Sequence, residues 1–234
     1  MINIENLTVK YGGVVALDGL TLTVTDDVMG LIGPNGAGKT TMTNAFSGFA
    51  PITAGRIVID GMNLLELAPH KRARWGVSRS FQKVQIVGDL TVAEHLLAVC
   101  DAKGIKRNER VGVIGTVLDF AGISACRDML GDSLNPYQKR MTEIAKCLIG
   151  APKIILLDEP GGGLSESEMQ DLRRIITQTK NRFGAQIIMV DHDVDLIRDV
   201  CTSIAVLDFG KLIAFGPTRE VLQDEAVKTA YLGR

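Results

Sequence analysis

The feature that most constrains the fold is a glycine-rich segment between an apolar run and an amphipathic stretch. The apolar run VMGLIG covers 28–33, the segment GPNGAGKT covers 33–40, and helical spacing continues through Ala45 and Phe46. Glycines let a backbone wrap around a phosphate group, and the N–H groups at the start of a helix bind its oxygens. The pattern G-x-x-x-x-G-K-[ST] in this setting predicts a phosphate-binding loop in an α/β fold. The alternative is a glycine turn that only leads into a helix.

Several side chains in and near this segment suit nucleotide chemistry. Lys39 would reach the β- and γ-phosphates, and the hydroxyl of Thr40 would ligate Mg²⁺. Tyr11 could stack on adenine as a flat apolar surface, although a tyrosine at the end of a strand is also ordinary. The predicted nucleotide-binding residues are Tyr11, Gly33, Pro34, Asn35, Gly36, Ala37, Gly38, Lys39, Thr40 and Thr41.

The remaining patterns predict a single α/β domain over 1–234. INIENLTVKY near the N-terminus alternates apolar and polar residues, and TLTV and RIVID are short and rich in strand-forming residues, so we expect an antiparallel β layer. From Lys153 onward, KIILLD, AQIIMVD and SIAVLD are continuous apolar runs separated by helical segments, which predicts a buried parallel sheet. We therefore predict a P-loop nucleotide-binding core at 1–87 and 151–234, with an inserted α-helical subdomain at 88–150.

Polar side chains at the ends of these runs are candidates for catalysis. Asp158 could hold Mg²⁺, and Glu159 could polarise an attacking water. His192 follows a parallel strand, where ligands bind in open α/β sheets; a helix-capping or surface histidine is the alternative. Gln82, in a loop after a short strand, could complete a magnesium shell through its carbonyl oxygen. The predicted catalytic residues are Glu159, His192 and Gln82, and the predicted metal ligands are Thr40, Gln82 and Asp158.

The composition argues against other classes of protein. A hydrophobic content of 46% against 23% charged residues excludes wholesale disorder. The net charge of -1 gives no electrostatic reason to expect a nucleic-acid partner. No apolar run approaches the ~20 residues that cross a bilayer, and the start MINIENLTVK does not have the pattern of a secretory signal. The four cysteines lie far apart, which favours buried, reduced thiols in a cytoplasmic protein.

The motifs together resemble those of the ATP-binding cassette (ABC) ATPases. Tyr11, the loop at 33–40, Gln82, ILLDEP at 155–160 and His192 occur in the order and spacing of that family, over essentially the whole chain. The resemblance implies the ABC ATPase fold, the cofactors ATP and Mg²⁺, and ATP hydrolysis that drives transmembrane permease subunits from the inner face of the cell membrane. It also implies a hetero- or homodimer with a second ABC ATPase subunit. Each ATP would lie between one subunit's phosphate loop and the other's signature motif, usually L-S-G-G-Q.

Longer segments resemble one subgroup, the branched-chain amino-acid importer ATPases. These segments are SRSFQKVQIVGDLTVAEHL, RMTEIAKCLIGAPKIILLDEP, VDHDVDLIRDVCTSIAVLDFGKLIAFGPTREVL and the C-terminal VKTAYLG. The lipopolysaccharide-export ATPases share much of this and are an alternative, as is a non-transport or regulatory ABC ATPase. The presence of Glu159 and His192 argues against a module that only binds ATP. Members that act on DNA carry a long coiled coil before the signature, whereas here only 83–133 intervene, without heptads.

The chain departs from the family at the signature position, where it reads Leu134, Asn135, Pro136, Tyr137 and Gln138. Asn135 suits an N-cap, Pro136 suits the first helical position, and Gln138 can close a capping box, so the helix start is retained. Pro136 has no N–H and Tyr137 adds a ring, so we expect weaker phosphate binding.

A second departure is Ser165, where the family usually has Asp or Asn. If the partner is a different ATPase subunit, as is usual in branched-chain importers, the dimer would be asymmetric. Replacing Tyr137 by glycine would then raise turnover.

Overall fold

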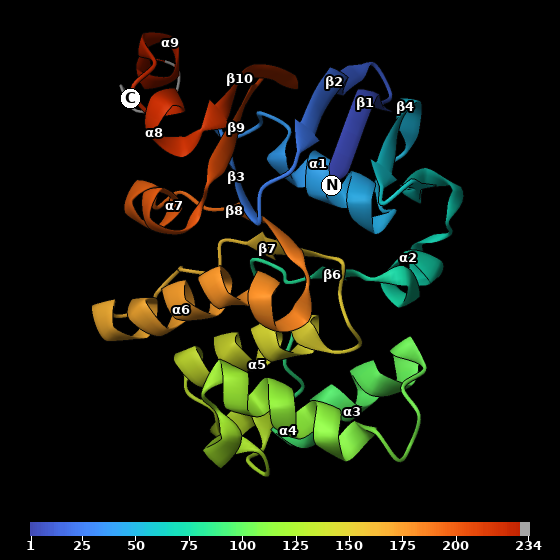
Figure 1. The fold of residues 1–234 in the computed structure, drawn as a ribbon, viewed down its shortest axis with the longest axis vertical. Helices are drawn as coiled ribbons and strands as arrows, with labels where there is room; N and C mark the ends of the chain where they lie inside the picture. Colours follow the sequence, from blue (N-terminus) through green and yellow to red (C-terminus); the bar gives the residue numbers. More distant parts are fainter. Residues whose placement is uncertain (230–234) are drawn as a thin grey trace. The chain divides into compact units, whose positions relative to one another are not determined.

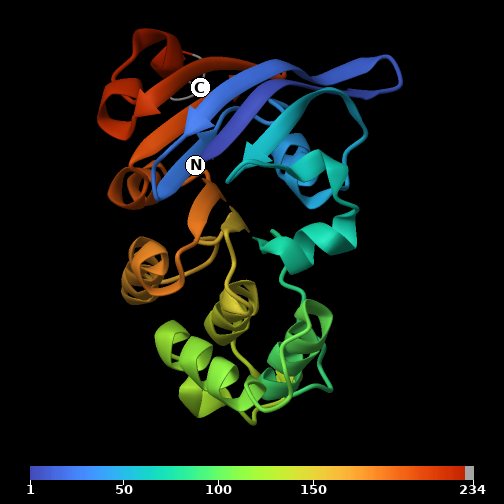
Figure 2. The ribbon, with the colours of Figure 1, turned by 45° about the vertical axis from the view of Figure 1, so that its right-hand side comes forward.

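The computed structural model describes residues 1–229, which form two compact units (Figure 1 and Figure 2). The first unit is Met1–Arg72 together with the described residues from Ile188 onward, and the second is Ala73–Ile187. Strand β8 (Gln186–Val190) carries the chain from the second unit back to the first. Residues 230–233 of the predicted tail VKTAYLG lie outside the described residues.

An antiparallel sheet in the order β2-β1-β4-β5 belongs to the first unit. Its strands are β1 (Ile2–Tyr11), β2 (Val14–Val24), β4 (Ile52–Ile59) and β5 (Met62–Asn63). In β1 the apolar residues Ile2, Ile4, Leu7 and Val9 are buried, so the alternation in the sequence corresponds to one buried face. The predicted antiparallel layer is confirmed, and β2 begins well before the predicted 21–24.

The same unit contains a parallel strand pair. Strand β3 (Val28–Ile32) is parallel to β9 (Ser203–Asp208), and β10 (Lys211–Pro217) pairs antiparallel with β9. All five residues of β3 are buried, as expected for a strand covered on both faces. Its described helices are α1 (Lys39–Ser47), α7 (Val194–Val200), α8 (Thr218–Val221), α9 (Glu225–Val227) and the 3-10 turn Leu64–Glu66, while α2 (Pro69–Trp75) crosses into the second unit.

The second unit combines another parallel strand pair with four longer helices. Strand β6 (Val77–Arg79) pairs with β7 (Ile154–Asp158). The helices are α3 (Val92–Lys103), α4 (Arg110–Ala121), α5 (Pro136–Leu148) and α6 (Glu166–Phe183), with 3-10 turns at Ser124–Cys126 and Gly131–Ser133. Helices α3, α4 and α5 pack against one another (Figure 1). The predicted subdomain 88–150 lies within this unit, and its bounds stay a prediction.

Three of these helices begin with a capping box. In each, the N-cap side chain accepts the N–H of the third helical residue, whose side chain accepts the N-cap N–H. The pairs are Thr91–Glu94 in α3, Asn135–Gln138 in α5 and Ser165–Glu168 in α6. Each pair has the spacing typical of a capping box, with Ser, Thr or Asn followed three positions later by Glu or Gln, and in α5 Pro136 is the first helical residue as expected.

The four cysteines, Cys100, Cys126, Cys147 and Cys201, are buried and form no disulfide. Burial raises the pKa of Cys147 and Cys201 to about 12. It also raises the pKa of Cys100 and Cys126 above the ordinary value. The expectation of buried thiols is therefore confirmed. Among residues 1–229, no helix is long and apolar enough to cross a membrane.

Arg72 on α2 secures the C-terminal end of α1. Its side chain is buried, and Nη1 donates to the carbonyl oxygens of Ala45 (2.6 Å) and Phe46 (3.3 Å). Its Nε donates to the carbonyl oxygen of Leu67 at 2.8 Å. The last carbonyls of a helix have no partner within the helix, so Arg72 supplies donors that α1 itself cannot provide.

We expect Arg72→Ala to lower the free energy of unfolding by about 2 to 3 kcal/mol, because buried carbonyl oxygens lose a charged donor. Urea unfolding followed by circular dichroism measures this change. Lys71→Ala, at the exposed neighbouring position on the same helix, is the matched control and should change stability little. Equal losses in the two variants would contradict the role of Arg72.

Candidate active site

The predicted phosphate loop connects β3 to α1, and its backbone requires glycine at two points. A Cβ on Gly33 (φ 148°) would lie 2.2 Å from the carbonyl oxygen of Leu207, and one on Gly38 (φ 106°) would lie 2.7 Å from that of Ala16. No other residue fits such positions. Gly38 is also the N-cap of α1 and supplies no side-chain cap. The first N–H groups of α1 are therefore not covered by a capping side chain, which is the arrangement that binds phosphate oxygens.

Lys39 lies inside the curve of this loop. Its side chain is buried, and Nζ donates to the carbonyl oxygens of Gly33 (2.6 Å) and Pro34 (2.9 Å). A phosphate group would offer this ammonium charged oxygens, which are stronger acceptors than neutral carbonyls. The glycine backbone, the uncapped helix start and the buried ammonium together fit a nucleotide polyphosphate.

Two further predicted residues lie in the first unit. Tyr11 ends β1 opposite Val14 and is 42% exposed, so its ring can accept a stacking partner. His192 is exposed just after β8, and its N–H donates to Oδ1 of the buried Asp191 at 2.7 Å. The same oxygen accepts the N–H of Asp193 at 3.0 Å, so Asp191 fixes the turn that carries His192. The roles of Tyr11 and His192 stay predictions.

In the second unit, the structure brings together two of the predicted catalytic residues. Nε2 of Gln82 donates to Oε2 of Glu159 at 2.8 Å, which links the loop after β6 to the end of β7. This bond does not use the carbonyl oxygen of Gln82, the atom predicted to bind Mg²⁺. Glu159 has φ 47°, a left-handed backbone that is rare for such a residue and that clusters at functional positions.

Asp158 has a cationic neighbour that the sequence does not reveal. Nη2 of Arg79 lies 3.5 Å from Oδ2 of Asp158, and both side chains are largely buried. Burial lowers the pKa of Arg79, and the negative charge of Asp158 partly opposes that shift. Ser80 Oγ accepts the N–H of Asp158 at 3.2 Å. Arg79 and Ser80 thus hold Asp158 in place, but no motif marks them because their importance comes from the pairing of β6 with β7.

Magnesium needs few protein ligands when phosphate oxygens and water complete its shell. The described residues contain no group of three or more His, Cys, Asp or Glu that could hold a metal ion by themselves. The oxygen donors of Thr40, in the first unit, and of Gln82 and Asp158, in the second, are of the kind that magnesium prefers. Their roles as metal ligands stay predictions.

The signature-position segment, 134–138, forms the start of α5. The side chain of Asn135 accepts the N–H of Gln138 at 2.8 Å, and the side chain of Gln138 accepts the N–H of Asn135 at 2.9 Å. Pro136 has no N–H. Of the backbone donors at 135–138, only that of Tyr137 is not used by the capping box. The helix start is retained, as predicted, while its set of donors is reduced.

Tyr137 has a hydrogen-bond partner that no sequence pattern indicates. Its hydroxyl donates to Oδ2 of Asp171 on α6 at 3.0 Å, and the ring is half-buried. Burial, and then the hydrogen bond to Asp171, raise the pKa of Tyr137 to about 12. The two residues are 34 positions apart, so only the packing of α5 beside α6 could reveal the contact.

Helix α5 also contacts the loop that carries Gln82. Arg140 is buried, and its guanidinium donates to the carbonyl oxygens of Phe81 (3.4 Å) and Gln82 (3.5 Å). Both distances are long, so each bond is weak. Arg140 nevertheless connects the helix that begins at the signature position to the backbone of the Gln82 loop.

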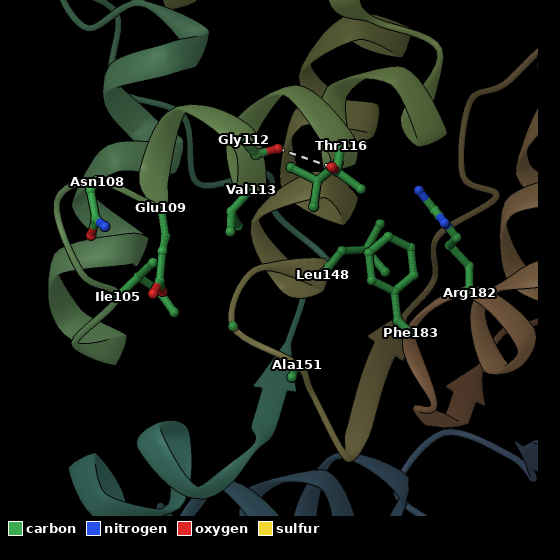
Figure 3. A pocket seen from close by; sticks show the side chains of 12 residues that line it. Ile105, Asn108, Glu109, Gly112, Val113, Thr116, Leu148, Ala151, Arg182 and Phe183 are labelled. Atoms are coloured by element: carbon green, nitrogen blue, oxygen red, sulfur yellow. Dashed lines mark hydrogen bonds between the residues drawn. The ribbon is translucent and has the colours of Figure 1, made fainter.

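A cleft of about 740 Å³ lies elsewhere in the second unit, between α4 and the C-terminal end of α6 (Figure 3). Val113, Leu148 and Phe183 line its apolar part, and Glu109 and Arg182 lie toward opposite sides of the view. None of the predicted site residues lines this cleft.

Comparison with known proteins identifies the family. Residues 7–162, more than half of the chain, match the family model described as ABC transporter. The chain belongs to the ABC transporter ATP-binding family. This ABC ATPase hydrolyses ATP in a reaction coupled to transport, and subunits of this kind dimerise and act with transmembrane permease components. The predicted fold is confirmed.

The ABC ATPase has relatives of two transport types. It is 38% identical over 231 residues to the lipopolysaccharide export system ATP-binding protein of Haemophilus influenzae, covering 98% of this chain and 95% of that protein. It is 32% identical over 250 residues to the high-affinity branched-chain amino acid transport ATP-binding protein of Pseudomonas aeruginosa, covering 100% and 98%. A crystal structure of an ATP-binding cassette of an ABC transporter in its ADP conformation superposes with a TM-score of 0.88 at 27% identity, covering 100% and 99%.

The left-handed backbone at Glu159 leads to a prediction about stability. We expect Glu159→Gly to be more stable than Glu159→Ala by about 1 kcal/mol, because both variants lose the carboxylate and only glycine relieves the strain. At Gln178, exposed in the middle of α6, the order should reverse, with glycine less stable than alanine by about 1 kcal/mol. Urea unfolding of the four variants tests both comparisons. The same order at both positions would show that Glu159 is not strained.

Proposed function

We propose that this ABC ATPase powers an importer of branched-chain amino acids or similar small polar solutes. The observation that carries the proposal is the start of α5. Because the capping box and Pro136 leave a single backbone donor at 135–138, a dimer of two identical chains would have two weak signature segments. A second, different ATPase subunit would supply a full signature for the ATP bound by this chain. Branched-chain importers, which this chain resembles, usually pair two different ATPase subunits. A chain with a weak signature segment is therefore expected in a transporter of this kind.

Lipopolysaccharide export is the second candidate. The identity of 38% to the Haemophilus influenzae export protein exceeds the 32% to the Pseudomonas aeruginosa amino-acid protein. Identity over an ATPase domain reflects the shared ATP chemistry, because the cargo is selected by other subunits. In the choice between the two candidates, we therefore give the weakened signature segment more weight than the difference between 38% and 32% identity.

The proposed roles follow from the chemistry of each group. The loop 33–41 binds the phosphates of ATP through Lys39 and the N–H groups of its residues other than Pro34, and Tyr11 stacks on the adenine. Asp158, Thr40 and Gln82 hold Mg²⁺, which neutralises phosphate charge when bound. Glu159 polarises the attacking water, and His192 positions it at the γ-phosphate. The hydrogen bond from Gln82 to Glu159 supports this assignment, because the amide can orient the carboxylate before a nucleotide binds.

The proposed partners are a second ABC ATPase subunit and transmembrane permease subunits, with the complex at the inner face of the cell membrane. The permease would dock on the Gln82 loop and the helices of 88–150. The contact of Arg140 with the carbonyl oxygens of Phe81 and Gln82 supports this, because a permease that moves the loop would also act on α5.

The turnover of ATP tests the catalytic assignment. Glu159→Gln should lower Mg²⁺-dependent turnover by about a hundredfold or more, because the amide cannot act as a base. Binding of ATP, followed with a fluorescent analogue, should be retained. The matched control is Glu220→Gln, exposed on α8, which should keep full turnover. Undiminished turnover in Glu159→Gln would exclude Glu159 as the base.

The cargo requires the assembled transporter. We expect the tagged chain to copurify with a different ATPase subunit and permease subunits, and the complex in proteoliposomes to take up radiolabelled leucine when ATP is inside. Glu159→Gln should abolish that uptake. A complex that contains only one type of ATPase subunit and that extracts lipopolysaccharide would overturn the importer proposal in favour of the second candidate.

A further inference from the structure

The ring of Tyr137 is large enough to cover the N–H groups at the start of α5. Side chains near a helix start lean toward the N-terminus, so an aromatic ring at the second helical position tends to lie over the N–H groups there. In α5 the segment 135–138 has one N–H outside the capping box, and it belongs to Tyr137 itself. A ring that leaned over the helix start would therefore cover the one backbone donor that remains.

The hydroxyl of Tyr137 is held away from the helix axis by a partner on another helix. It donates to Oδ2 of Asp171 at 3.0 Å, and a hydrogen bond to a carboxylate is stronger than one between neutral groups. Asp171 lies in the second turn of α6, which begins at the capped Ser165. A rigid helix thus carries the acceptor, so the position of the ring is set by packing within this chain.

We propose that Asp171 is a positioning residue that latches the Tyr137 ring against α6 and so keeps the N-terminus of α5 open to the phosphate of the partner subunit's ATP. This inference rests on the proposed function, because it concerns the signature-position segment of the same ATPase. At position 137 the family usually has a small residue, and the latch accommodates the larger tyrosine ring beside α6. Asp171 should therefore affect ATP turnover only when residue 137 has an aromatic ring.

The latch makes a prediction for double mutants. In the complex isolated through the tagged chain, every variant of this series also carries Glu159→Gln, so that the remaining turnover is that of the partner subunit's ATP and the Glu159→Gln chain is the parent. Asp171→Ala should lower this remaining turnover about tenfold, because the released ring covers the helix start. Tyr137→Phe, which keeps the ring and loses the hydroxyl, should do the same. Tyr137→Gly should turn over at least as fast as the parent chain, since no ring remains to be held. Adding Asp171→Ala to Tyr137→Gly should then have no effect.

Controls separate this role from a structural one. Gln170→Ala, exposed beside Asp171 on α6, should keep the remaining turnover of the Glu159→Gln parent, and all variants should keep its melting temperature within a few degrees. The latch would be overturned if Asp171→Ala lowered turnover by the same factor in the chain with Tyr137 and in the Tyr137→Gly chain. Parental turnover in both Asp171→Ala and Tyr137→Phe would also overturn it.

A second measurement observes the hydrogen bond without turnover. The chain has three tyrosines, so selective ¹³Cζ labelling gives a resolvable spectrum, and Tyr137→Phe assigns the signal. Because the pKa of Tyr137 is raised, its signal should remain that of the neutral phenol at a pH where an exposed tyrosine has begun to ionise. Asp171→Ala should shift that ionisation to lower pH. An unchanged titration would show that the bond is absent in solution and would overturn the proposal.

A hundredfold loss of turnover in Glu159→Gln, with no further loss when Asp171→Ala is added, would overturn the latch alone. Undiminished turnover in Glu159→Gln would instead remove the proposed active site on which the latch rests. The two failures are therefore distinguishable in a single series of purified complexes.

Discussion

The fold of the first unit depends on how closely the start of the phosphate loop approaches β9. Gly33 brings its Cα to a point where a Cβ would meet the carbonyl oxygen of Leu207 at 2.2 Å. This approach lets the buried strand β3 turn directly into the loop, and it places Lys39 where loop carbonyls surround its ammonium. A polyphosphate site is thus built mainly from backbone, with one charged side chain, and backbone is positioned by the strands that it belongs to.

Much of this arrangement could be predicted because it is local. The phosphate loop, the three capping boxes and the buried runs at β3, β7 and β9 each follow from residue types at fixed spacing, and the structure contains all of them. Sequence patterns even predicted the start of α5 at Pro136, although that segment departs from its family. Short-range geometry alone decides such features.

The contacts that could not be predicted join residues far apart in the chain. The pairs Arg79–Asp158, Gln82–Glu159 and Tyr137–Asp171 depend on which strands and helices become neighbours. The strain at Glu159 is equally invisible, because the residue before a proline gives no sign of a left-handed backbone. Strand β10 and helix α2 lacked clear signals, since one is half-exposed throughout and the other has only seven residues.

The burial of all four thiols has a practical consequence for chemical labelling. Thiolates, not thiols, react with maleimides and other alkylating reagents, and each of these cysteines is both shielded and shifted toward the protonated form. The native cysteines should therefore react little with such reagents while the protein is folded. A single cysteine introduced on the surface can carry a spectroscopic probe without first removing them, and their later alkylation would report when the core opens.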